Sequence, residues 1–173
     1  MQNRKILFMF MILGFLIPSG TIMAQSATAA TIPLTGTIWG SYDPGFEGEG
    51  AWVGYAMISV NGGTPRKATI ADRNTGAAFY KDGSFSGTEV ITLTFVDGGG
   101  TFCIDGRFCA SRGMTPSFYT LFENGKIARG TGKYAKAEGD VTVVGPFIMP
   151  GPDMKAGTAL WVAEIYGTIS GVN

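Results

Sequence analysis

Two carboxylates lie in stretches of alternating polarity, where an acid or a base can face an apolar interior. Glu89 shares one face of a predicted strand with Ile91 and Leu93. Glu164 shares a face of the last predicted strand with Tyr166. A carboxylate on a strand face that points into an apolar interior, such as the lumen of a barrel, has a raised pKa. It can act as an acid or a base, or stabilise a developing cation. We therefore take Glu89, Glu164 and Tyr166 as candidate catalytic residues. The alternative is a strand-end charge that reaches water or forms a salt bridge.

Histidine is absent from the whole sequence. Its absence excludes Ser-His-Asp and Cys-His mechanisms and removes the usual zinc ligand. Acidic residues crowd the glycine-rich segment 43–50, but their spacing matches no calcium loop. The sequence therefore predicts no metal site and no cofactor.

The three tryptophans are candidate ligand-binding residues. Trp39, Trp52 and Trp161 each lie in a predicted strand and can line the interior of a small ligand-binding barrel. The alternative for each is ordinary core packing, because aromatic side chains dominate protein cores.

The two cysteines flank a short segment that reads as a hairpin turn. Cys103 and Cys109 enclose the residues IDGRF, and a turn at residues 105–107 places them opposite each other on paired strands. In an exported chain with two cysteines so placed, we predict a Cys103–Cys109 disulfide. A two-residue turn instead shifts the register and puts the two cysteines out of line.

The first 24 residues have the organisation of a cleavable signal peptide. A positive segment at Arg4 and Lys5 precedes an apolar run at 6–17, a break at Pro18 and small residues up to Ala24. We predict export to the periplasm or the medium, with no membrane span after cleavage; an uncleaved anchor is the alternative. Cleavage leaves a mildly acidic chain without a clustered basic excess, so no nucleic-acid partner is predicted.

Apolar periodicity along the rest of the chain is nearly all of period two, which indicates strands. Asp105-Gly106 indicates a hairpin, and Asn124-Gly125 is the strongest signal for a two-residue hairpin turn in the chain. We expect residues 25–34 to be disordered and residues 35–173 to form one domain. The predicted fold is all-β: a single small antiparallel β-barrel of about eight strands, because sequential hairpins favour an up-and-down order and closure removes exposed edges. The predicted strands are 36–42, 52–60, 67–72, 88–96, 101–104, 117–123, 126–132, 140–145 and 159–170.

The segment 126–147, KIARGTGKYAKAEGDVTVVGPF, carries a recognisable arrangement of small and aromatic residues. A strand ends in Gly-Thr-Gly, an aromatic residue follows two positions later, and Ala and Gly precede the next strand. The residues concerned are Gly130, Thr131, Gly132, Tyr134, Ala137 and Gly139. The pattern resembles the barrel family that includes allene oxide cyclases and plant dirigent proteins. Strand glycines of this kind mark bends at barrel corners, and Tyr134 can cover the barrel end. The resemblance implies a lumen that holds a hydrophobic substrate, and it transfers no catalytic residue.

Three functions follow from these expectations. The first is a binding or scaffold module for a small apolar molecule. The second is a cyclase or isomerase that acts on a hydrophobic substrate in the lumen, and the third is a structural surface or matrix protein with a packed lumen. The sequence leaves open assembly into a homo-oligomer. Lumen volume separates these functions: a lumen below about 300 Å³, the size at which ligand pockets begin, would argue against both ligand functions.

Overall fold

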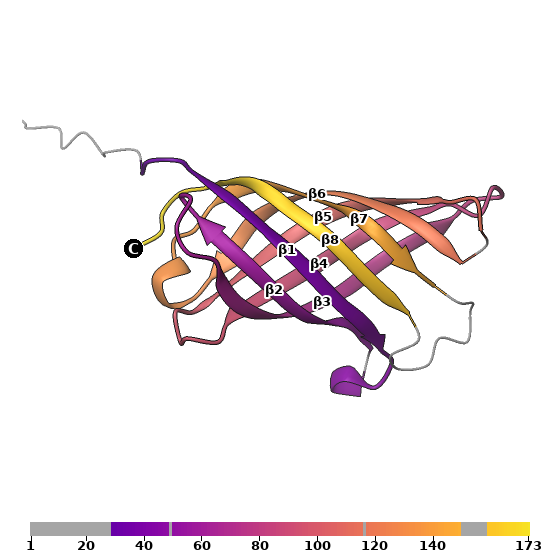
Figure 1. Cartoon of the computed structure of the whole chain (residues 1–173), viewed down its shortest axis with the longest axis horizontal. Helices are drawn as coiled ribbons and strands as arrows, with labels where there is room; N and C mark the ends of the chain where they lie inside the picture. Colours follow the sequence, from indigo (N-terminus) through magenta and orange to yellow (C-terminus); the bar gives the residue numbers. More distant parts are fainter. Residues whose placement is uncertain (1–28, 49, 116, 150–158) are drawn as a thin grey trace, which may run out of the picture.

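The computed structural model describes residues 29–48, 50–115, 117–149 and 159–173, and the predicted signal peptide at 1–24 lies outside them. Within this part of the chain, eight antiparallel strands close into one barrel in sequence order (Figure 1). The predicted all-β, up-and-down barrel is therefore confirmed. The strands are β1 (Ile32–Asp43), β2 (Ala51–Val60), β3 (Arg66–Phe79), β4 (Phe85–Phe95), β5 (Thr101–Arg112), β6 (Phe118–Gly130), β7 (Gly139–Ile148) and β8 (Leu160–Ile169).

Alternation of side chains along each strand separates the lumen from the outer surface. In β4, the predicted face of Glu89, Ile91, Leu93 and Phe95 is buried, whereas Thr88 on the other face is exposed. Period-two alternation places successive side chains on opposite faces of a sheet, so the apolar set of every strand fills one interior. The core of the protein is thus the lumen itself.

Pairing between β1 and β8 closes the barrel. Their register runs from Ile32 opposite Ile169 to Ser41 opposite Leu160. Closure gives every strand two hydrogen-bonded neighbours and removes the exposed edges that invite aggregation. β1 begins at Ile32, so the predicted boundary between a disordered segment and the barrel at residue 35 is too late. No helix of the described residues is long and apolar enough to cross a membrane.

The two predicted glycine hairpins are wrong. Gly106 lies inside β5 and Gly125 lies inside β6, and the two residues face each other in the middle of the paired strands. Glycine within a strand often marks a place where another group approaches closely. At Gly106 the approaching group is the buried side chain of Glu123.

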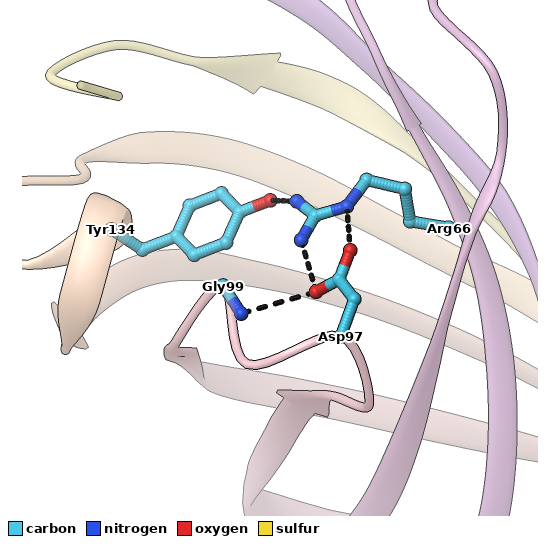
Figure 2. A network of polar contacts seen from close by, with 4 residues as sticks. All are labelled: Arg66, Asp97, Gly99 and Tyr134. Atoms are coloured by element: carbon cyan, nitrogen blue, oxygen red, sulfur yellow. Dashed lines mark hydrogen bonds and ion pairs between the residues drawn. The ribbon is translucent and has the colours of Figure 1, made fainter.

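One end of the barrel is closed by a tyrosine. Tyr134 ends the 3₁₀ helix η2 (Gly132–Tyr134) and is 1% exposed, stacking on Phe95 at 4.8 Å between ring centroids. Arg66 Nη1 donates to the Tyr134 hydroxyl at 2.8 Å, and Arg66 also forms an ion pair with Asp97 (Figure 2). The prediction that Tyr134 covers a barrel end is confirmed.

The sharp turn into η2 needs a residue with positive φ. Gly132 provides it at φ 58°, a backbone conformation that glycine adopts without the steric strain of a Cβ atom. The chain can therefore turn back over the barrel and present Tyr134 to the lumen. The C-terminus lies at this same end, and the 3₁₀ helix η1 (Phe46–Gly48) lies at the other (Figure 1).

Candidate ligand site in the barrel lumen

The lumen is not completely filled at the end opposite Tyr134. A cavity of about 160 Å³ is enclosed there by residues from all eight strands. Aromatic side chains dominate its wall, and two acidic side chains, Asp72 and Glu89, also reach it. The lining residues are Tyr42, Trp52, Asp72, Asn74, Ala77, Phe79, Phe85, Glu89, Phe108, Leu121, Phe147, Met149 and Trp161.

Three carboxyl groups from three strands meet beside this cavity. Asp72 of β3 is 3% exposed, Glu89 of β4 is 4% exposed and Glu123 of β6 is fully buried. In the described structure, Asp72 Oδ1, Glu89 Oε1 and both carboxyl oxygens of Glu123 are buried without a hydrogen-bond donor. Buried polar groups in proteins are nearly always hydrogen-bonded, so these oxygens require an explanation.

A pair of glycines makes space for the Glu123 carboxyl group. A Cβ atom added at Gly106 would lie 1.8 Å from Glu123 Oε1, and one added at Gly125 would lie 3.2 Å from the same oxygen. Glu89 lies opposite Gly106 across β4 and β5. The missing side chain at Gly106 therefore allows the carboxyl groups of Glu89 and Glu123 to approach each other across β5.

Burial raises the pKa of all three groups, because the charged form loses its hydration. The pKa of Glu123 rises to about 10, first through burial and then through the charge and hydrogen bonding of Glu89. Burial and the neighbouring Glu89 also raise the pKa of Asp72 well above its usual value. Burial raises the pKa of Glu89, and hydrogen bonds from Glu123 and Asp72 oppose that rise.

These shifts define how protons are distributed in the cluster. Glu123 holds a proton at neutral pH and can donate it to Glu89, and burial shifts the pKa of Asp72 in the same direction. The carboxyl groups can therefore act as donors to one another. If the cluster loses one proton, Glu89 is the group that ionises, because hydrogen bonds from Glu123 and Asp72 stabilise its carboxylate form. Glu89 is also one of the two carboxyl groups that line the cavity.

The aromatic wall is built around Trp52. Its ring lies 6.3 Å from that of Trp161, 5.8 Å from Phe147 in edge-to-face orientation and 5.6 Å from Tyr42, measured between centroids. The indole N–H of Trp161 is buried without an acceptor among the described residues. At the rim, Phe79 is 72% exposed and stacks on Phe85.

The candidate catalytic residues lie on two different faces of the barrel wall. Glu89 faces the lumen, whereas Glu164 and Tyr166 are exposed on the outer face of β8. Their assignment to an apolar lumen face was wrong, because the other face of that strand, with Ala163 and Ile165, points inward. Both faces of this strand carry apolar residues, so alternation alone did not identify the buried one.

The three tryptophans also lie on two different faces of the barrel wall. Trp52 and Trp161 line the cavity, as predicted. Trp39 is 37% exposed on the outer surface, where its ring lies 6.4 Å from that of Tyr55. Trp39 is therefore not a lumen residue, and its predicted place in a ligand site is wrong.

Two of the three buried carboxyl groups were missed by the sequence analysis. A signal for each is present in its strand: Asp72 follows Ala68 and Ile70 at alternate positions, and Glu123 follows Leu121 in the same way. An acidic residue that continues an apolar period-two series is directed to the interior. Early termination of the predicted strands at turn-like residues hid this pattern.

The predicted disulfide is wrong. Cys103 and Cys109 are free and lie on the same strand, β5, instead of on two arms of a hairpin. Six residues of extended strand separate their Cα atoms by about 20 Å, whereas a disulfide requires about 4.4–6.8 Å. No backbone adjustment short of breaking β5 would bring these sulfur atoms together.

Four ion pairs lie on the outer surface of the described residues. A shallow depression over β4–β6 contains Lys126 and Arg129, which form ion pairs with Asp140 and Asp105 at 2.6 Å and 2.7 Å. Among the described residues, no group of three or more His, Cys, Asp or Glu side chains is arranged to hold a metal ion. The lumen cavity is therefore the place where unpartnered polar groups and an apolar wall coincide.

No family model matches the chain, and neither the curated proteins nor the solved structures contain a significant match. The resemblance of residues 126–147 to allene oxide cyclase and dirigent barrels therefore stays a prediction.

Proposed function

We propose that the chain is an exported binding protein for one small, largely apolar molecule, held in the open end of the barrel lumen. The observation that carries this proposal is the cavity of about 160 Å³, whose wall is aromatic and whose buried acidic groups have no hydrogen-bond partner other than one another. Export rests on the signal peptide predicted at residues 1–24.

The size of the cavity restricts the ligand. Its 160 Å³ lies below the roughly 300 Å³ that the sequence analysis set as the limit for a ligand-holding lumen, so by that limit both ligand functions fail. The limit describes pockets for drug-sized molecules, and the proposal therefore holds only for a smaller ligand. Lipid-like or polycyclic ligands are therefore excluded from the cavity as it stands. An engineered cavity of about 150 Å³ in another protein accepts benzene, so a single substituted ring is the appropriate size.

Burial of the carboxyl groups favours binding over a purely structural role. A carboxyl group without a hydrogen-bond partner costs stability in an apolar interior, and a barrel that served only as a scaffold would be better filled by aliphatic side chains. The cavity is lined by Asp72 and Glu89 instead. Polar groups that converge on an apolar pocket are the usual means of orienting a ligand.

A cyclase or isomerase activity is the second candidate. Glu89 lines the cavity and has a raised pKa, so it can donate or accept a proton within reach of a bound molecule. This candidate requires turnover in addition to binding, and it needs the same site.

Two isosteric probes, benzyl alcohol and benzylamine, test the binding proposal. We expect each to perturb the amide resonances around Trp52 and Trp161 in ¹H–¹⁵N NMR titrations. Ala77 lines the cavity, so Ala77→Phe should abolish the perturbation. Ala78→Phe, one position along β3 and on the opposite face, is the matched control and should retain it. Absence of binding by both probes to the wild-type protein would refute the proposal.

A further inference from the structure

We infer that the ligand is a small organic cation: a primary amine on a single aromatic or aliphatic ring, with its ammonium group against Asp72 and Glu89. This inference rests on the lumen site proposed above and adds the chemical class of its ligand. Asp72 Oδ1 and Glu89 Oε1 are buried, have no donor in the described structure other than the neighbouring carboxyl groups, and belong to side chains that line the cavity. An ammonium group would bring both donors and a positive charge, which the carboxyl groups do not supply to one another.

No positive charge of the protein supplies those donors within the described residues. None of the Lys or Arg side chains there is buried. Arg73 is the neighbour of Asp72 in sequence, but it lies on the other face of β3 and forms an ion pair with Glu47. The buried cluster therefore has no internal counter-charge.

The wall of the cavity suits a cation. The faces of aromatic rings carry negative electrostatic potential and attract ammonium groups, most strongly where water is excluded. The ring centroid of Trp52 lies 6.3 Å from that of Trp161 and 5.8 Å from that of Phe147, and all three rings line the cavity. Carboxyl groups and aromatic rings in the same wall complement a charged nitrogen on an apolar body.

Other donors fit this wall less well. A metal ion such as Ca²⁺ requires six to eight oxygen ligands, which an aromatic wall does not provide. A hydroxyl group brings one donor, whereas an ammonium group brings three together with a full charge. The ammonium group is therefore the donor that can serve both carboxyl groups at once.

Protons in the cluster must rearrange when a cation binds. The groups that face Glu89 are Asp72 from β3 and, across the space left by Gly106 of β5, Glu123 from β6. An ammonium ion favours the ionised form of Glu89, so its entry releases to solvent any proton that this carboxyl group holds and leaves the net charge of the lumen unchanged. Glu123 keeps its proton and can continue to donate to the Glu89 carboxylate.

Benzylamine and benzyl alcohol separate this inference from the binding proposal, because they differ only in the charged group. In isothermal titration calorimetry near neutral pH, we expect the wild-type protein to bind the amine at least about tenfold more tightly than the alcohol. Titrations in two buffers of different ionisation enthalpy should show release of up to one proton per amine bound and none for the alcohol.

Glu89→Gln keeps the shape of the side chain and removes the charge, so it should reduce the ratio of the two affinities to about one. Asp72→Asn provides a second, independent variant for the same comparison, should Glu89→Gln fold poorly. Equal affinity of the wild-type protein for both probes would overturn the inference and leave the binding proposal intact. An unchanged ratio in both variants would also overturn it, and failure of both probes to bind would remove the binding proposal itself.

Discussion

Replacement of Glu123 by glutamine isolates the energetic effect of a buried acid. Glu123 is fully buried, and its carboxyl oxygens occupy the space above Gly106. Gln has nearly the same shape as a protonated Glu and cannot ionise. Because the Glu123 pKa rises to about 10 in the folded protein, the side chain is protonated at neutral pH, and Glu123→Gln preserves its charge state.

The sign of the pH effect follows from linkage. Below the ordinary pKa of 4.5, Glu123 carries a proton in both the folded and the unfolded chain and makes no pH-dependent contribution. Above it, the unfolded chain releases this proton while the folded chain retains it. The free energy of unfolding of the wild-type protein should then fall by up to about 1.4 kcal/mol per pH unit from this group, until the folded pKa is reached.

Glu123→Gln has no such proton and should lose this part of the slope. Between about pH 5 and about pH 8, the free energy of unfolding of the variant should therefore rise relative to wild type by up to about 4 kcal/mol. Urea denaturation followed by tryptophan fluorescence, repeated across this pH range, measures the difference directly.

A control variant separates burial from the loss of one carboxyl group. Glu164→Gln removes an exposed carboxylate from the outer face of β8 and should leave the pH slope of the wild-type protein in place. If Glu123→Gln and the wild-type protein show the same slope, Glu123 does not hold a proton in the folded lumen, and the proposed distribution of protons in the cluster is refuted.

Two further substitutions and one thiol assay test the packing of the barrel. Gly106→Ala should destabilise the wild-type protein by about 1–3 kcal/mol, because its Cβ atom would lie 1.8 Å from Glu123 Oε1. In a Glu123→Ala background this destabilisation should largely vanish. Additive effects of the two substitutions in the double-mutant cycle would contradict the contact. Tyr134→Phe removes the acceptor of a hydrogen bond from an arginine, which should lower the free energy of unfolding by about 1–2 kcal/mol in urea titrations. Without reductant, intact-mass analysis after alkylation should count two thiols, and Cys109, which is exposed, should react before the half-buried Cys103. A mass lower by two hydrogen atoms and no alkylation would show a disulfide.

The general architecture was accessible from the sequence because its signal is repeated in every strand. Alternating apolar residues and the lack of helical periodicity indicate a closed antiparallel sheet, and each hairpin adds an independent instance of the pattern. The position of Tyr134 was also predictable, because an aromatic residue in a glycine-bounded turn between two strands has the barrel end as its nearest apolar surface.

The site was less accessible, because its residues resemble local turn signals. Asp105-Gly106 and Asn124-Gly125 have the composition of tight hairpin turns. Their glycines serve instead to leave space for the carboxyl group of Glu123, which approaches from the lumen. A short-range pattern cannot distinguish a glycine that permits a turn from one that permits a contact with a residue 17 positions along the chain, as between Gly106 and Glu123.

The same confusion accounts for the error in the cysteines. A turn at residues 105–107 would have paired Cys103 with Cys109, whereas a continuous β5 places them on one outer face, far apart. One misassigned glycine thus produced a false disulfide and, at the same time, concealed a real contact. Long-range packing decided the conformation of this segment against its local propensity.

The features that distinguish this lumen from an ordinary barrel core, namely buried acids, a strand glycine and a cavity, lie together towards one end of the barrel. The interior near Tyr134 is filled by aliphatic and aromatic side chains, as stability alone would require. Towards the other end, the barrel accepts three buried acids, a glycine that weakens β5 and an unfilled cavity. Each of these features lowers stability when taken alone. Their coincidence in one cavity is best explained by a bound molecule that fills the space and supplies a charge to the carboxyl groups, because such a molecule would compensate the cost of the acids and the cavity together.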